Sequence, residues 1–170
     1  MRILAIDPGQ TSGWCWYDAE TRRVIDGGTF AAHAMPSNLP FNTAACVVER
    51  TVAHGPTRPQ VVECAYIGGR IVSDLMHLYK LGPVRELTRL EVRRALTNAT
   101  HGTVRVKDDA TAWGALKLMH GGESADVKAL KDGSRFAGPL AGINSHARAA
   151  CALAVALACE DKAWLESLPF

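Results

Sequence analysis

The clearest candidate for chemistry is an acid that follows a short apolar run near the start of the chain. Residues 3–6 are continuously apolar, as in a buried strand, and Asp7 is followed at once by Pro8 and Gly9, which end the run. Asp7 is therefore expected at the end of a strand. A carboxylate there is costly to remove from water unless a cation meets it, so the sequence predicts a basic side chain or a metal ion beside Asp7.

Length and composition limit the classes of protein to consider. The chain has 170 residues, of which 48% are hydrophobic and 21% charged, so we expect one globular domain over residues 1–170. The formal charge is +2, from 19 Lys and Arg against 17 Asp and Glu, which neither requires nor excludes a polyanionic partner. The five cysteines show no metal-finger spacing, and no apolar run reaches membrane-spanning length. We expect a cytoplasmic protein with reduced cysteines and no membrane contact.

The order of predicted elements is mixed, with strands first and helices later. Three strands near residues 2–7, 13–18 and 23–31 are close enough in sequence to form an antiparallel meander. Further predicted elements are a helix over 39–54, a strand over 60–66, a helix over 69–82, a strand over 83–87, and helices over 90–97, 109–119 and 146–161. Thr88 and Glu91 form a capping-box pattern, Asn144 or Ser145 can cap the last helix, and the glycine-rich stretch 120–143 is expected to be mobile. Strands that alternate with helices favour parallel additions to the meander.

These motifs together resemble a known family. The segment "ILAIDPG" with Gly13 and Trp14, then "VVECAY" with Glu63, then the Ala-rich "SHARAACALAVALA", looks like the RuvC-type Holliday-junction resolvases in order and spacing over nearly the whole chain. The resemblance implies an RNase H-like α/β fold: a five-stranded mixed sheet, an antiparallel meander plus parallel strands, flanked by helices. It also implies structure-selective, metal-dependent and symmetric cleavage of four-way DNA junctions.

The resemblance implies that Asp7 and Glu63 lie on neighbouring strands and hold two Mg²⁺ or Mn²⁺ ions. Two-metal catalysis activates water with one ion and stabilises the leaving oxygen with the other, and oxygen ligands select these metals. Pro8 and Gly9 would turn the backbone sharply and leave room for metal and phosphate. In the alternative reading, Asp7 caps a turn and Glu63 forms a salt bridge at a sheet edge.

The third metal ligand is where the sequence departs from the family. Resolvases of this type place two ligands one helical turn apart, and His146 matches the first position while Ala149 stands at the second. A shifted register would instead pair Arg148 with Cys151, neither of which suits Mg²⁺. Three explanations stay open: the site uses His146 with two carboxylates, an acid enters from a loop (Asp108, Asp109 or Asp132), or Ala149 replaces an Asp. As an alternative, His146 bonds only to backbone or solvent at the helix start.

Substrate contacts follow from the same resemblance. Tyr66 matches an aromatic residue that stacks on bases, and Lys107 matches a basic residue near the scissile phosphate, with a proposed catalytic role. Arg70 and Arg105 are predicted to bind the DNA backbone, as basic side chains commonly do. Each of these residues is alternatively an ordinary core or surface side chain.

A near-symmetric junction is cut on two opposed strands, so the resemblance implies a homodimer, through a helix such as 70–82 or 109–119. No nucleotide cofactor is expected. The host is a bacterial or phage-infected cell, with an organelle as a further location. Three other functions compete: a junction-binding protein without nuclease activity, an RNase H-like nuclease for ribosomal RNA precursors, and a fragment of an actin-like or sugar-kinase-like ATPase.

Overall fold

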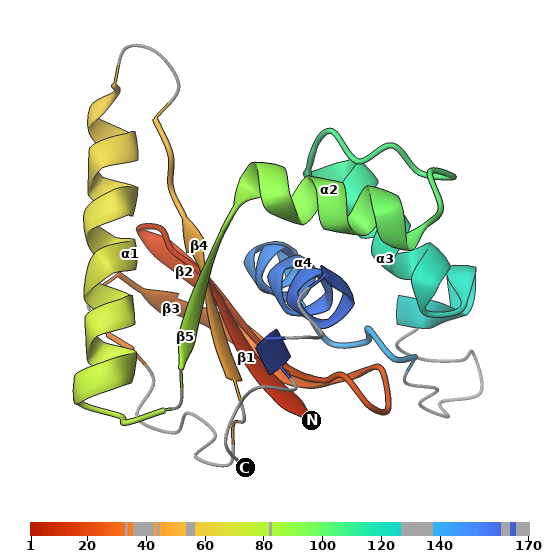
Figure 1. Ribbon diagram of the computed structural model, residues 1–170, viewed down its shortest axis with the longest axis horizontal. Coiled ribbons are helices and arrows are strands. Elements are labelled where there is room, and N and C mark those ends of the chain that lie inside the picture. The colour runs from red at the N-terminus through yellow and green to blue at the C-terminus, as the bar shows by residue number, and fades with distance from the viewer. Residues whose placement is uncertain are drawn as a thin grey trace.

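A five-stranded mixed sheet in the order β3-β2-β1-β4-β5 forms the centre of the fold (Figure 1). The computed structural model describes residues 1–32, 34–35, 43, 45–53, 57–81, 83–126, 138–160 and 164–165. Its strands are β1 (Arg2–Asp7), β2 (Thr11–Asp18), β3 (Arg23–Ala31), β4 (Ala45–Arg50) and β5 (Val84–Thr88). The first three strands pair antiparallel as a meander, whereas β4 runs parallel to β1 and β5 runs parallel to β4. The predicted fold class is therefore confirmed.

Helices cover both faces of this sheet. They are α1 (Pro59–His77), α2 (Arg89–Ala99), α3 (Asp109–Met119) and α4 (Ser145–Glu160), with a short 3₁₀ helix, η1, at Gly122–Asp126. Helix α1 covers one face, while α4 lies on the opposite face with α2 and α3 beyond it (Figure 1). Two buried apolar clusters result, one on each face of the sheet. None of the described helices is long and apolar enough to cross a membrane.

Side-chain caps begin three of these helices. The predicted capping box of Thr88 and Glu91 is present at the start of α2, and Asp108 and Thr111 form a second one at α3. At α4 the side-chain oxygen of Asn144 accepts a hydrogen bond of 3.1 Å from the backbone N–H of Ala147. The predicted helices 90–97 and 109–119 are confirmed, and the helix predicted over 146–161 is confirmed in its described part, as far as Glu160. Of the glycine-rich stretch 120–143, residues 127–137 lie outside the described residues.

Two predicted elements are wrong. The helix predicted over 39–54 is instead strand β4 in its described part, because the apolar residues 45–48 are consecutive and all buried between strand neighbours. The strand predicted over 60–66 is the first part of helix α1, which also contains most of the helix predicted over 69–82 and ends at His77. Pro59 suits the first turn of a helix, and the spacing of the buried residues Ile67, Ile71 and Leu75 is helical.

One glycine sets how closely α4 approaches the sheet. Gly13 on β2 pairs with Asp7 on β1, and a Cβ atom at Gly13 would overlap the backbone carbonyl of His146 in the first turn of α4. The missing side chain lets the start of α4 lie directly on the sheet edge that carries Asp7.

Gly13→Ala should therefore lower the free energy of unfolding by about 3 kcal/mol, because backbone must move to admit the methyl group. Chemical denaturation measures this loss. The matched control is Gly69→Ala in α1, where a Cβ atom would meet no atom within 4 Å. The control should leave stability unchanged or raise it by about 0.5–1 kcal/mol, as alanine does in a helix interior. Equal effects at the two glycines would contradict this account of the α4 contact.

Candidate functional site

Two carboxylates meet at the ends of parallel neighbouring strands. The register pairs Ile6 with Val48, so the next residues, Asp7 on β1 and Glu49 on β4, follow side by side. Burial, and then the charge of Glu49, raise the pKa of Asp7 to about 7 from a usual value of 3.8, and a hydrogen bond to Glu49 adds to the shift. Two carboxylates can share a hydrogen bond only if one of them keeps a proton. Asp7 therefore lies beside a second acid, as well as near a basic side chain.

Glu49 is a candidate site residue that the sequence prediction missed, while Glu63 lies elsewhere than expected. Glu63 is on helix α1 and not on a strand, and its Oε2 accepts a hydrogen bond of 3.2 Å from Nε2 of Gln10. The carboxylate that contacts Asp7 is Glu49. A signal for it was present, because "ACVVE" repeats the pattern of "ILAID": four apolar residues and then an acid.

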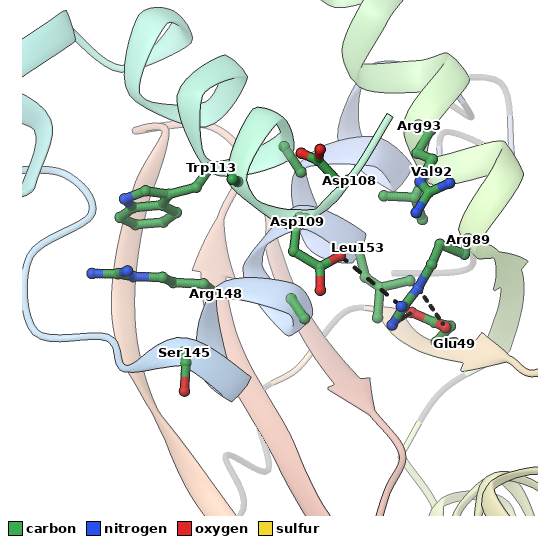
Figure 2. A pocket seen from close by; sticks show the side chains of 14 residues that line it. Glu49, Arg89, Val92, Arg93, Asp108, Asp109, Trp113, Ser145, Arg148 and Leu153 are labelled. Atoms are coloured by element: carbon green, nitrogen blue, oxygen red, sulfur yellow. Dashed lines mark hydrogen bonds and ion pairs between the residues drawn. The ribbon is translucent and has the colours of Figure 1, made fainter. Parts of the chain in front are cut away.

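A guanidinium group pairs with Glu49. Arg89 opens α2, directly after β5, and its Nε lies 3.2 Å from Oε1 of Glu49 while its Nη2 lies 3.4 Å from Oε2. Its Nη1 lies 4.0 Å from Oδ1 of Asp109 at the start of α3. Figure 2 shows this bridge, with Arg89 between Glu49 and Asp109. We refer to Asp7, Glu49 and Asp109 as the carboxylate cluster.

Two cavities open beside the carboxylate cluster. One, of about 680 Å³, is lined by Asp7, Glu49 and Arg89 together with residues of α1 such as Cys64. The other, of about 400 Å³, is lined by Glu49, Arg89 and Asp109 and by the first turns of α3 and α4 (Figure 2). Glu49 and Arg89 line both cavities, so their ion pair lies between the two. A ligand in either cavity can reach the cluster.

The start of α4 reaches this site without bringing an acid. Ala149 lines the smaller cavity at the position where the family pattern calls for an acid. His146 is exposed, and its backbone carbonyl faces Gly13. Of the residues in the shifted register, Arg148 stacks on Trp113 with its guanidinium carbon 4.5 Å from the ring centroid, and Cys151 is buried beside Cys15.

The loop acids proposed as a third ligand differ in what their side chains contact. Asp109 belongs to the carboxylate cluster, whereas the Asp108 side chain accepts hydrogen bonds from Thr111 and caps α3. Asp132 lies outside the described residues. Of the two loop candidates that the structure describes, Asp109 is therefore the one in the carboxylate cluster.

The residues predicted to contact DNA fall into two groups. Tyr66 and Arg70 lie on α1, where the Tyr66 ring is 67% exposed and Arg70 pairs with Asp74 at 3.8 Å. Arg105 and Lys107 are both exposed in the segment that leads into α3. Lys107 is two residues before Asp109, so the backbone holds it close to the carboxylate cluster.

The oxygen ligands at this edge fit a divalent metal such as Mg²⁺. Asp7 and Glu49 are hard oxygen donors, and the raised pKa of Asp7 marks a place where negative charges are crowded and a cation is favoured. Among the described residues, however, no group of three His, Cys, Asp or Glu is arranged to hold a metal ion. The arrangement thus offers two adjacent carboxylates, with Asp109 held apart by Arg89.

Asp7→Asn should stabilise the metal-free protein more at pH 8 than at pH 5. Because folding raises the pKa of Asp7, the folded state binds more protons than the unfolded state between about pH 4 and 7. The free energy of unfolding therefore falls as pH rises through this range. Asn is neutral throughout, so its advantage should reach about 1–3 kcal/mol at pH 8.

Denaturant unfolding of both proteins at the two pH values measures this difference. Glu86→Gln removes an exposed carboxylate of the same sheet and controls for the loss of one charge. Equal effects of Asp7→Asn at pH 5 and pH 8 would show that Asp7 is not crowded by Glu49.

Comparison with known proteins places this geometry in a known fold. No protein-family model matches the chain, and no curated protein matches its sequence. Among solved structures, RuvC of Thermus thermophilus superposes with a TM-score of 0.61 at 17% identity, covering 97% of this chain and 98% of that one. T. thermophilus RuvC in complex with a Holliday junction substrate superposes with a TM-score of 0.57 at 15% identity, covering 96% of each chain. The chain therefore has a RuvC-type, RNase H-like fold.

Proposed function

We propose that this chain is a metal-dependent endonuclease that cuts branched DNA, with four-way junctions as its principal substrate. The observation that carries the proposal is the crowded carboxylate pair, Asp7 and Glu49, at the carboxyl ends of two parallel central strands. The junction-bound RuvC neighbour supports the choice of substrate. In this proposal residues 1–170 form a single nuclease domain.

Asp7 and Glu49 would hold Mg²⁺ or Mn²⁺ in this nuclease. The bound metal supplies an activated water and stabilises charge on the leaving oxygen. Asp7 would hold the metal as an ionised carboxylate, and Arg89 orients the carboxylate of Glu49 through two contacts. Pro8, directly after Asp7, lines the larger cavity, in which a phosphate would lie beside Asp7.

The DNA-binding roles predicted from the sequence remain part of the proposal. Arg105 and Lys107 would contact backbone phosphates at the entrance to α3, where Lys107 also lies near the reacting phosphate. Tyr66 and Arg70 would contact the crossover strands from α1, where an exposed ring can stack on any base. His146, at the first turn of α4, is kept as a further metal ligand to be tested.

Asp7→Asn and Glu49→Gln should each slow cleavage of a synthetic four-way junction in Mg²⁺ by about 100-fold, because each removes a charge that stabilises the transition state. Both substitutions keep the shape of the side chain, and gel analysis of nicked strands measures the rate. Glu86→Gln is the matched control and should cut at the wild-type rate.

Glu63→Gln decides which acid is the second ligand. If Glu63→Gln abolished cleavage while Glu49→Gln still cut the junction, Glu63 and not Glu49 would be the second ligand. Hydrolysis of ATP by the wild type, without cleavage of DNA, would favour the ATPase alternative.

A junction-binding protein without nuclease activity is the second candidate, and the lack of an acid at position 149 favours it. Ala149 lines the cavity beside the cluster, so an acid there would face the reacting phosphate. Binding of a four-way junction without nicks in Mg²⁺ or Mn²⁺ would support this candidate. A large gain of cleavage in Ala149→Asp would identify the present chain as an inactive form of a nuclease.

Two symmetric cuts require two active sites, so we infer that the chain acts as a homodimer. The end of α1 presents Met76, 50% exposed, followed by Leu78, 73% exposed, and this apolar end falls within the helix predicted to dimerise. A second copy of the chain would bury both side chains.

Replacing both Met76 and Leu78 with Glu should convert the dimer to a monomer in light scattering, because apolar contact would become charge repulsion. Leu118→Glu changes an exposed leucine of α3, 49% exposed, and tests the other predicted helix. A dimer that dissociates only with Leu118→Glu would move the interface to α3, and a monomeric wild type would contradict the homodimer.

A further inference from the structure

Arg89 fills part of the space in which a second metal ion would otherwise lie. Its guanidinium makes two contacts with Glu49, at 3.2 and 3.4 Å, and lies 4.0 Å from Asp109 (Figure 2). These are the two acids of the cluster that face the smaller cavity. A metal ion that bridged Glu49 and Asp109 would have to displace this guanidinium.

The charges around Arg89 hold it in that position. Burial lowers the pKa of Arg89, but the charges of Glu49, Asp109 and Asp7 outweigh burial and raise it. The guanidinium is thus a permanent cation for all three acids, and its planar fork suits a carboxylate better than a point charge does. Asp108, the remaining acid of this cavity, is engaged by Thr111 at the start of α3.

Charge balance at the cluster leaves room for one divalent ion. Three ionised carboxylates and one guanidinium carry a formal charge of −2, which a single divalent ion neutralises. A second ion would add positive charge beside the guanidinium and the first ion, which is unfavourable at short range. The geometry agrees with this balance, because Asp7 and Glu49 adjoin each other while Asp109 is separated from Glu49 by Arg89.

We propose that Arg89 takes the place of one of the two metal ions expected for this fold, so that the chain binds a single divalent ion at Asp7 and Glu49. The inference rests on the proposed function, since it concerns the same metal site. Arg89 is a positioning residue in this scheme: it holds Glu49 and excludes a second ion.

The experiment is a titration of the metal-free full-length protein with Mn²⁺ at pH 8, without DNA, followed by electron paramagnetic resonance and calorimetry. The wild type should bind one Mn²⁺ per chain. Arg89→Gln should bind Mn²⁺ about tenfold more tightly or take up a second ion, because it frees two carboxylates from a competing cation. Arg89→Lys keeps the charge and should stay much closer to the wild type.

Arg93→Gln is the matched control for the loss of one positive charge. Arg93 lies one turn further along α2 and lines the same two cavities, but no ion pair to Glu49 or Asp109 is found for it in the described part of the chain. It should change Mn²⁺ affinity much less than Arg89→Gln. If Arg89→Gln fails to fold, the number of ions bound by the wild type still decides the question.

Three results would overturn the inference. Two Mn²⁺ ions of similar affinity in the wild type would show that Arg89 excludes nothing. If the wild type, Arg89→Gln and Arg93→Gln bound Mn²⁺ with equal affinity, Arg89 would again be shown to exclude no ion. The proposed metal site would then still stand. No Mn²⁺ binding by any folded variant would overturn both this inference and the proposed nuclease.

Discussion

The parallel pairing of β1 and β4 is the constraint on which the site depends. Parallel neighbours bring their carboxyl ends to the same edge of a sheet, and both strands contain four buried apolar residues followed by an acid. Asp7 and Glu49, 42 positions apart in the sequence, become adjacent for that reason alone. The rest of the fold supports this edge: the meander fixes β1 in the middle of the sheet, and β5 leads directly into Arg89.

Two adjacent carboxylates in a partly buried edge oppose folding unless something compensates their charge. The structure provides two forms of compensation. Asp7 keeps a proton up to about pH 7, and Arg89 neutralises Glu49 from the other side. A bound cation would be a third form, and it would release the proton on Asp7.

The sequence was sufficient for the overall architecture but not for the acid that lies beside Asp7. The meander, the capping box at Thr88 and the long Ala-rich helix were predicted because each depends on local spacing. Glu49 was missed because alanines and valines around it also fit a helical period, and only pairing with β1 and β5 selects the strand. Glu63 was misplaced for the opposite reason: "VVECAY" has strand-forming residues, yet Pro59 and the apolar spacing that follows continue one helix of 19 residues. Arg89 could not be predicted as a partner of these acids, since its position depends on how β5 ends.

The most direct test of this account is the position of a metal in a crystal of the wild-type protein soaked in Mn²⁺. Anomalous scattering from manganese should give one strong peak between the carboxylate oxygens of Asp7 and Glu49. A peak at Glu63 or His146 instead, or none at the ends of β1 and β4, would contradict the claim that these two strands form the metal site.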